Sequence, residues 1–481
     1  MILSKDLKQI LDLGIIMSSE KNHLVLLEKI LHESMTISNC DGGTLYICKD
    51  NMLHFFLYKT ISKNVLAGGI HEELKLPPLE INENSVAGNC ALKRKTINVA
   101  DVYNDDNYNW TGPKKYDEMN NYHTQSILVI PLIDNENELI GVMQLINAQD
   151  ENGIIPFSKD IEYVITSLAS QCAILLSNML LLDNIQKLLD SFVNAMTTAI
   201  ESRTPYNANH TKNVSKLCES FIDYLIEKKY YTLTKNDKEQ LVMAAMLHDV
   251  GKMIVPLSVL NKATRLEGKL DLMKARWKII ELDLENKYLK NIYNEEEYLT
   301  ILEQFKSSCA FIELVDTLGF IDNEKQQRIS EIIDLEYNTI FGKLKIVEEN
   351  EEKDVRIVKG TLTKEERIEI EKHAEYTKHI LKEIEFGKKY NNVEFIAGAH
   401  HEYIDGSGYP SKLDTTDLSI LVRILTIMDV FESLTSTDRP YKKPMSKDRA
   451  FSILTEMVKE GKLDENLVIY LGEYLGIGDR V

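Results

Sequence analysis

The sequence predicts a multidomain protein with an N-terminal α+β domain, a long coiled-coil helix and a C-terminal all-α domain. Three observations indicate this division: short β-type runs fill the first part of the chain, apolar residues then recur every seven positions, and nearly all of the remainder has a helical pattern. With 481 residues, the chain is long enough for two or three separate cores. We place the boundaries at 1–158, 159–203 and 204–481.

The first domain is predicted from β-type runs at 41–48, 126–132 and 139–147, each bounded by turn residues. A helical pattern at 24–35 precedes them. Strands separated by turns, with helices at the flanks, favour an antiparallel sheet in an α+β domain.

The second element is predicted from two apolar stripes with a seven-residue period between residues 161 and 200. Their members are Ile161, Leu168, Leu175, Leu182, Leu189 and Met196, and Ile165, Cys172, Met179, Gln186, Val193 and Ile200. Such a seam is typical of a left-handed coiled coil, which would join two copies of the chain as a homodimer. The alternative is one long amphipathic helix that packs on its own domain.

The third domain is predicted from a succession of helical patterns. We expect helices at 210–229, 235–249, 363–386, 391–403, 417–436 and 446–460. Residues 263–360 interrupt them as a helical insertion, with patterns at 270–284 and 295–314. The acidic runs at 295–297 and 348–354 are interpreted as solvated turns.

Composition limits the possible partners and the location. A net charge of −19 disfavours a broad basic face, so we expect no nucleic-acid polymer and no anionic membrane as partner. Six cysteines are scattered without CxxC spacing and the N-terminus lacks a leader pattern, which predicts a cytoplasmic protein. Polar residues interrupt the most apolar stretch, 164–182, so no membrane span is predicted.

The strongest chemical signal is a set of histidines and aspartates. Five of the eleven histidines fall at motif positions: His210, His248, His373, His400 and His401. His248 is followed by Asp249. Asp429 ends an apolar helical run, where burial of an unpaired carboxylate would be costly. Imidazoles and carboxylates from distant helices are typical of an open site for divalent transition metals, and the chain is interpreted as a metallohydrolase.

Two parts of the chain resemble known families. The segments "SVAG", "NVADVY" and "GVMQLINAQ" resemble the GAF sensory domain over residues 20–180. Asn147-Ala148 stands where the cyclic-nucleotide-binding branch has Asn-Lys, so the GAF ligand is unknown. The domain would either bind a small molecule or serve mainly as a dimerising scaffold.

The segments "HDVGK", "HHEYIDGSGYP" and "DRPYKKP" resemble the HD-GYP branch of the HD superfamily of phosphohydrolases. This resemblance covers about residues 195–262 and 361–475 and implies hydrolysis of cyclic di-GMP to linear pGpG, sometimes continuing to GMP. Two alternatives remain. One is hydrolysis of another cyclic dinucleotide such as 3′,3′-cyclic GMP-AMP, and the other is a largely non-enzymatic signalling module that responds to metal or redox state.

The resemblance also implies roles for individual residues. One metal ion would be held by His210, His248, Asp249 and Asp429, and a second by His373, His400 and His401, with Asp249 bridging. We expect two ions, iron or manganese, although zinc and nickel also accept such ligands. Tyr206 stands where some members carry a glutamate for a third metal.

Substrate contacts are assigned in the same way. Lys252 would hold a phosphate oxygen and act in catalysis with Asp249, while Arg439 and Lys442 would clamp the second phosphate. Tyr409 would stack on or hydrogen-bond near a guanine, or be a structural residue of the turn, and Gly406 and Gly408 would let the backbone turn close to the ligand. Glu402 and Asp405 are interpreted as residues that orient the ligands or cap a helix.

Overall fold

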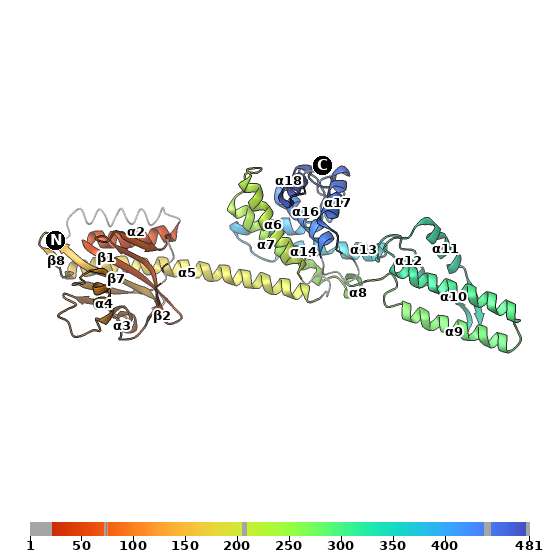
Figure 1. Ribbon diagram of the computed structural model, residues 1–481, viewed down its shortest axis with the longest axis horizontal. Helices are drawn as coiled ribbons and strands as arrows, with labels where there is room; N and C mark the ends of the chain where they lie inside the picture. Colours follow the sequence, from red (N-terminus) through yellow and green to blue (C-terminus); the bar gives the residue numbers. More distant parts are fainter. Residues whose placement is uncertain (1–21, 72–73, 75, 204–208, 437–443, 478–481) are drawn as a thin grey trace. The chain divides into compact units, whose positions relative to one another are not determined.

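The computed structural model describes residues 22–71, 74, 76–203, 209–436 and 444–477 (Figure 1). The chain divides into two compact units, 1–189 and 190–481. The division falls inside one continuous helix, α5 (Lys159–Glu201), which has 43 residues. The predicted long helix is therefore confirmed.

The N-terminal unit is built on an antiparallel sheet with strand order β3-β2-β1-β7-β6-β5. The strands are β1 (Cys40–Lys49), β2 (Met52–Thr60), β3 (Val65–Gly68), β4 (Leu79–Glu80), β5 (Ile97–Val99), β6 (Ile127–Ile133), β7 (Leu139–Asp150) and β8 (Gly153–Ile155). Its helices are α2 (His23–Ile37), α3 (Val86–Lys93) and α4 (Thr111–Asn120). The predicted α+β domain and its three β-type runs are confirmed, while β2, with nine residues, and the short strands β3, β4, β5 and β8 were missed.

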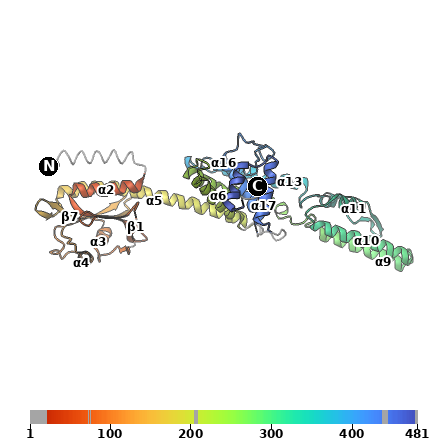
Figure 2. The same cartoon turned by 45° about the horizontal axis from the view of Figure 1, so that its top comes forward.

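Each face of this sheet carries its own apolar core. One core gathers Leu27 and Ile30 of α2, Leu45 of β1 and Ile165 of α5, and the other gathers side chains of α3 with the opposite face of the strands. Figure 2 shows α2 and α5 on one side of the sheet and α3 on the other. The alternation of side chains along each strand explains why both faces are filled.

The first half of α5 belongs to this core. Ile165, Leu168 and Cys172, which lie on the predicted coiled-coil seam, are buried against the chain's own sheet. Exposed apolar side chains follow further along the helix, at Leu181, Leu182, Ile185, Leu188 and Phe192. The first half of α5 thus packs on its own domain, as the alternative has it. Of the exposed side chains only Leu182 lies on the predicted seam, and the two-stranded coil stays a prediction.

By length and composition alone, α5 could also cross a membrane, and 39% of its most apolar window is buried in the structure. Ile165 and Cys172 of this helix are buried in the core of the N-terminal unit.

The C-terminal unit contains the predicted helical bundle. Its helices are α6 (His210–Glu227), α7 (Lys235–Leu247), η1 (Val250–Met253), α8 (Leu257–Leu260), α13 (Lys364–Glu371), α14 (His373–Lys382), η2 (Lys388–Tyr390), α15 (Val393–Gly398), α16 (Ile420–Thr435), α17 (Lys447–Lys459) and α18 (Glu465–Leu475). The expected helix 363–386 is two helices that meet at Lys372, and the expected helix 391–403 already ends at Gly398. The helix α18 was not expected.

The insertion has a separate apolar core. We had expected it to be helical throughout, but it also contains two strands. It comprises α9 (Leu270–Leu289), α10 (Glu295–Thr317), α11 (Asn323–Ile333), β9 (Glu336–Thr339), β10 (Gly342–Lys345) and α12 (Glu349–Val355). The strands β9 and β10 pair as a hairpin. The prediction missed it because its eight strand residues are mostly polar, with little alternation.

The acidic runs of the insertion form helices, so their interpretation as turns was wrong. Residues 295–297 make the first turn of α10, where carboxylates are favourable, and Asn294 caps that turn. Glu351 and Asp354 of α12 are buried, because Arg276 pairs with Glu351, and Lys262 and Lys269 pair with Asp354.

Candidate metal centre

The predicted metal ligands lie at helix ends in the C-terminal unit. His210 and His373 are the first residues of α6 and α14, and His248 and Asp249 directly follow α7. His400 and His401 follow α15, and Asp429 projects from within α16. A side chain at a helix end can enter a space that several helices surround without crossing a helical backbone.

The first group of ligands surrounds Asp429. The Nε2 atom of His210 lies 3.1 Å from Asp429 Oδ1 and 3.7 Å from Asp249 Oδ2. The Nε2 atom of His248 lies 3.4 Å from Asp249 Oδ2 and 3.8 Å from Asp429 Oδ1. Ligand atoms of His210, His248 and Asp429 all lie within 4.8 Å of one another, so they could share one ion.

The second group consists of His373, His400 and His401, whose ligand atoms also lie within 4.8 Å of one another. Asp249 connects the two groups, since its Oδ1 lies 3.6 Å from His373 Nε2 while its Oδ2 faces the first group. Asp249 also forms a group with His248 and His400. The structure thus brings the seven predicted ligands together, with Asp249 between the two groups.

Three of the histidines are oriented in the same way. The Nδ1 atoms of His248, His373 and His400 lie 2.7, 2.5 and 2.6 Å from the carbonyl oxygens of Ala245, Ile370 and Ala397, each three residues earlier. A proton on each Nδ1 leaves the lone pair of Nε2 directed into the site. His248 Nε2 is fully buried without a hydrogen-bond partner, which fits a metal ligand.

Glu432 orients the remaining buried histidine and was missed in the sequence. One of its carboxylate oxygens accepts from His210 Nδ1, and the other accepts from the Asn213 amide at 3.0 Å. Glu432 lies three residues after Asp429, so both carboxylates share a face of α16. The three-residue spacing from Asp429 was the signal in the sequence that could have indicated Glu432.

The electrostatics of the site keep Asp249, His373 and His401 in the protonation states that bind a metal. Burial alone would raise the pKa of Asp249, but Lys252 and the neighbouring imidazoles bring it well below its usual value. Burial, reinforced by Lys252, lowers the pKa of His373 to about 4, and burial with His373 beside it lowers that of His401 to about 3. Neutral imidazoles and an ionised carboxylate are the forms that bind a metal.

His210 differs from the other histidines. Burial would lower its pKa, but its bonds to Asp429 and Glu432 raise the pKa to about 9. With Lys252, whose Nζ lies 2.5 Å from Asp249 Oδ2, it balances the buried carboxylates. Divalent cations are suited to replace this positive charge.

Close backbone packing holds the turn that carries His248 and Asp249. The hydroxyl of Thr377 donates to the His248 carbonyl at 2.8 Å and accepts from Gly251 N at 2.9 Å. A Cβ on Gly251 would lie 1.9 Å from the His373 carbonyl oxygen. Gly251 thus lets α14 approach and bring His373 to the site.

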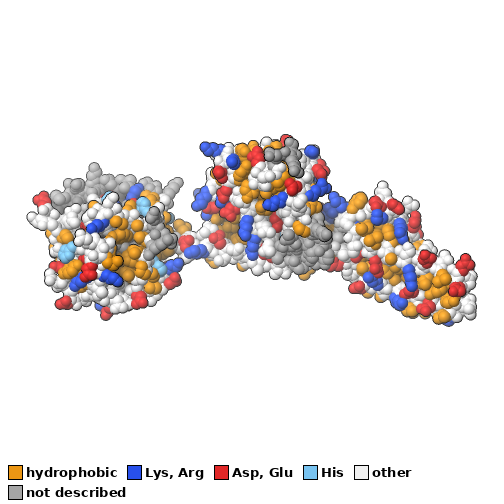
Figure 3. Space-filling view, in the orientation of Figure 1, with side chains coloured by type: hydrophobic (Ala, Val, Ile, Leu, Met, Phe, Trp, Pro, Cys, Tyr) orange, Lys and Arg blue, Asp and Glu red, His pale blue; other side chains and the backbone are white. Residues whose placement is uncertain are grey.

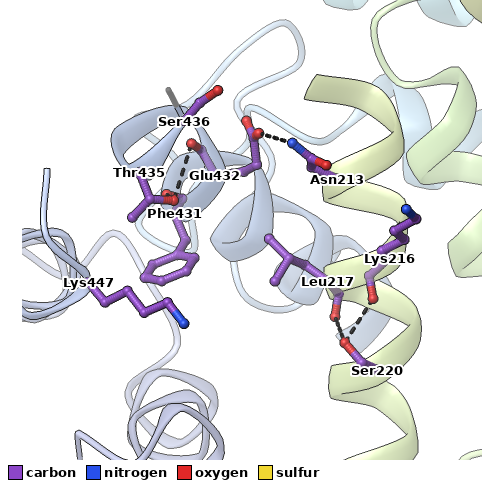
Figure 4. A pocket seen from close by; sticks show the side chains of 9 residues that line it. All are labelled: Asn213, Lys216, Leu217, Ser220, Phe431, Glu432, Thr435, Ser436 and Lys447. Carbon is purple, nitrogen blue, oxygen red and sulfur yellow. Dashed lines mark hydrogen bonds between the residues drawn. The ribbon is translucent and has the colours of Figure 1, made fainter. Parts of the chain in front are cut away.

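A pocket of about 380 Å³ adjoins Glu432, between α6 and α16. Figure 4 shows the Glu432–Asn213 bond at its wall, with Lys216 and Lys447 also among the lining side chains. Glu432 thus lies at the wall of this pocket, although its side chain is buried.

The structure places two of the four predicted substrate residues, Lys252 and Tyr409, at the site. Lys252 contacts Asp249, and the Tyr409 ring lies against that of His401 with centroids 4.8 Å apart. Arg439 and Lys442, and likewise Tyr206, lie outside the described residues.

The loop after His401 is held by its own backbone and by Glu402. Glu402 accepts from the backbone nitrogens of Ser411 and Leu413 at 2.6 and 3.1 Å, and Asp405 accepts from Ser407. A Cβ on Gly408 would lie 2.5 Å from the His401 carbonyl oxygen. Glu402, Asp405 and Gly408 therefore shape the loop, and neither carboxylate orients a histidine ligand as we had expected.

Each of the two units contains a segment that matches the model of a known family. The GAF domain model matches residues 22–176, and the HD domain model matches residues 353–467. The chain contains a GAF domain and an HD domain. The matched part of the HD domain includes His373, His400, His401 and Asp429, while the structure brings His210, His248 and Asp249 to the same site from outside that range.

Curated relatives are similar over a short stretch. A 3'3'-cGAMP-specific phosphodiesterase 3 of Vibrio cholerae is 37% identical over 97 residues, 20% of this chain and 20% of that protein. The 3'3'-cGAMP-specific phosphodiesterase 1 of the same organism is 36% identical over 108 residues, 22% of this chain and 24% of that protein. The matches thus span less than a quarter of either relative.

Among solved structures, the GAF domain from an Acinetobacter phosphoenolpyruvate-protein phosphotransferase is similar to this chain. The similarity covers 38% of this chain and 98% of that one, with 12% identity and a TM-score of 0.29.

Proposed function

We propose that the HD domain is a binuclear metal-dependent phosphodiesterase that opens a cyclic dinucleotide. The observation that carries this proposal is the position of Asp249 between two histidine groups, with one carboxylate oxygen toward each. A carboxylate shared by two ions would hold them close enough to act together on one phosphodiester.

His210, His248 and Asp429 would hold one ion and His373, His400 and His401 the other, with Asp249 between them. Two divalent ions, iron or manganese by their preference for such ligands, would supply Lewis acidity and charge neutralisation at the reacting phosphate. The chain's own part is orientation. Backbone carbonyls fix the imidazoles, and Lys252 offers a cation that can move from Asp249 to a phosphate oxygen.

Cyclic di-GMP, cleaved to pGpG, is the first substrate we propose, because the chain carries the "HHEYIDGSGYP" run. A second candidate is 3′,3′-cyclic GMP-AMP, which the names of the curated relatives favour. In either case Tyr409 would contact a base, and Arg439 and Lys442 would contact the second phosphate. Both substrates carry two phosphodiesters, so the same metal site serves them.

We further propose that residues 1–158 sense a ligand not yet known, that 159–203 connect this sensor to the catalytic domain at 204–481, and that the chain acts as a cytoplasmic homodimer. Supporting the connection, the hydroxyl of Thr197 in α5 donates to the carbonyl of Met246, two residues before His248.

The test is anaerobic incubation of the protein, loaded with Mn(II) or Fe(II), with each cyclic dinucleotide and chromatography of the products. We expect a linear dinucleotide from at least one substrate and none from Asp249→Asn. Absence of product from both, with two ions bound per chain, would favour the non-enzymatic signalling module.

A further inference from the structure

A strongly basic pocket lies where the insertion ends and α13 begins. Its volume is about 390 Å³, and all ten residues that line it fall between 353 and 367. Five of them are cations and one is an acid: Lys353, Arg356, Lys359, Lys364 and Arg367, with Glu365. Blue Lys and Arg side chains show on the surface in the region of α12 and α13 (Figure 3). We call this site the α12–α13 pocket, and its charge contrasts with the net charge of −19 of the chain.

Most of the positive charge of the pocket is not neutralised by the chain itself. Arg356 pairs with Glu352 at 2.8 Å. The other four cations are exposed and form no ion pair with any residue that the structure describes. Between 353 and 367 the other acids are Asp354 and Glu366, and Lys262 pairs with both of them. Four unpaired cations against the single carboxylate of the pocket leave an excess of three positive charges.

The wall of the pocket also includes the N-terminus of α13. Thr363, Lys364 and Glu365 lie there, where the helix dipole favours negative charge. The pKa of the Glu365 carboxyl is lowered first by its own backbone amide and the Thr363 hydroxyl, and then by Lys353 and Lys364. A carboxylate is thus already stabilised at this place, and a larger anion would meet the same field.

The rest of the wall is apolar and suits a part of a ligand that carries no charge. It is formed by Ile357, Val358 and Leu362. Val358 is 39% exposed, so its side chain is available beside the cations. A Cβ on Gly360 would lie 3.9 Å from Arg367 Nη2, which places the guanidinium over the loop that joins α12 to α13. Because bases and sugars pack on apolar walls and a guanidinium pairs with phosphate, the pocket suits both parts of a nucleotide.

We propose that the α12–α13 pocket binds a nucleoside polyphosphate such as ATP or GTP. The phosphates lie among the unpaired cations and the base and sugar against the apolar wall, in a volume of about 390 Å³ that is within the range of small-molecule sites. The excess positive charge suits a di- or triphosphate better than a cyclic dinucleotide, whose phosphodiesters lack a doubly charged terminal phosphate. A nucleic-acid strand is disfavoured, because the positive charge is confined to one pocket of an acidic chain. None of the lining residues is a predicted metal ligand or substrate residue, so the pocket is separate from the metal centre.

Calorimetric titration of the full chain with ATP and with GTP tests the site. We expect at least one of the two to bind, and Lys364→Gln and Arg367→Gln each to weaken that binding about tenfold, with the thermal unfolding midpoint of each variant as the control for folding. Lys382→Gln removes an exposed cation from the last turn of α14, outside the pocket, and should leave the affinity unchanged. Binding of neither nucleotide, or equal affinities in the pocket variants and in Lys382→Gln, would overturn the proposal. Loss of binding in Lys252→Gln alone would place the nucleotide at the metal centre and would overturn it too.

Titration with pyrophosphate separates the nucleotide from its phosphates. Pyrophosphate offers the charge of the polyphosphate without a base or sugar, so it should bind more weakly than the nucleotide. Val358→Ser should weaken nucleotide binding about fivefold and leave pyrophosphate binding unchanged, because it removes apolar surface and no charge. Pyrophosphate that binds wild type as tightly as ATP and GTP would overturn the assignment to a nucleotide, since the apolar wall would then contribute nothing.

Discussion

Replacement of Glu432 by glutamine should weaken one metal site and leave the other intact. Glutamine keeps the size of Glu432 and an oxygen acceptor for His210 Nδ1, but removes the negative charge. His210 belongs to the group with His248 and Asp429, whereas His373, His400 and His401 have no hydrogen bond to Glu432 among those of the described residues. The change is therefore local to the first site.

The size of the effect follows from the role of the carboxylate. Loss of a charged partner behind a ligating histidine typically lowers metal affinity 10–100-fold, which is about 1.4–2.7 kcal/mol. The larger end is expected here because Glu432 is buried and its carboxylate accepts directly from His210 Nδ1. A glutamine carbonyl also accepts from His210 Nδ1 more weakly than a carboxylate, so the His210 tautomer with its proton on Nδ1 is less strongly favoured.

Calorimetric titration of metal-free protein with Mn(II) measures both sites. Wild type should show two binding events, and Glu432→Gln should weaken one of them by 10–100-fold. Asn213→Ala is the matched control, since it removes the other hydrogen bond of Glu432 at 3.0 Å without touching His210. Two unchanged affinities in Glu432→Gln would show that Glu432 has no part in metal binding.

Three further predictions concern the surroundings of the ligands. Gly251→Ala should destabilise the fold by about 1–3 kcal/mol in urea unfolding and lower metal content, because its Cβ would lie 1.9 Å from the His373 carbonyl oxygen; unchanged stability and metal content would refute the close contact. Metal-free protein should lose stability as the pH falls from 6.5 towards 4, since the pKa of His373 is about 4 in the folded state and the unfolded chain takes up the proton first. His373→Gln should reduce that slope by about 1.4 kcal/mol per pH unit, and the exposed His379→Gln should not; equal slopes would contradict the assigned pKa. Arg203→Met should lower kcat about 10-fold with metal content retained, because the Arg203 guanidinium donates to the carbonyls of Lys252 and Val255 and so positions the lysine; an unchanged kcat would exclude this role.

The sequence indicated these histidines and aspartates as a set, because any one of them alone would more often be an ordinary core or surface residue; their role as metal ligands stays a prediction. The histidines stand at the ends of apolar helical runs, and the resemblance assigned them to two groups that the structure then brought together. Glu402 was misinterpreted because a buried carboxylate next to a ligand has several uses. Only the folded loop shows that Glu402 binds the amides of Ser411 and Leu413.

Other features depend on contacts between distant segments and could not be read from local pattern. Thr377 and Gly251 are 126 residues apart in sequence, and nothing in either segment shows that their backbones meet. The first half of α5 was assigned to a seam because a stripe of period seven fits a partner helix and a sheet equally well. Burial of Leu168 against the sheet decides between them.

The central claim is that Asp249 unites two metal ions into one hydrolytic site. The most direct measurement takes metal content and cyclic dinucleotide turnover from the same anaerobic samples of wild type and Asp249→Ala. We predict two ions per chain and a linear dinucleotide product for wild type, and loss of turnover with fewer than two ions for Asp249→Ala. Normal turnover by Asp249→Ala with two ions still bound would contradict the account.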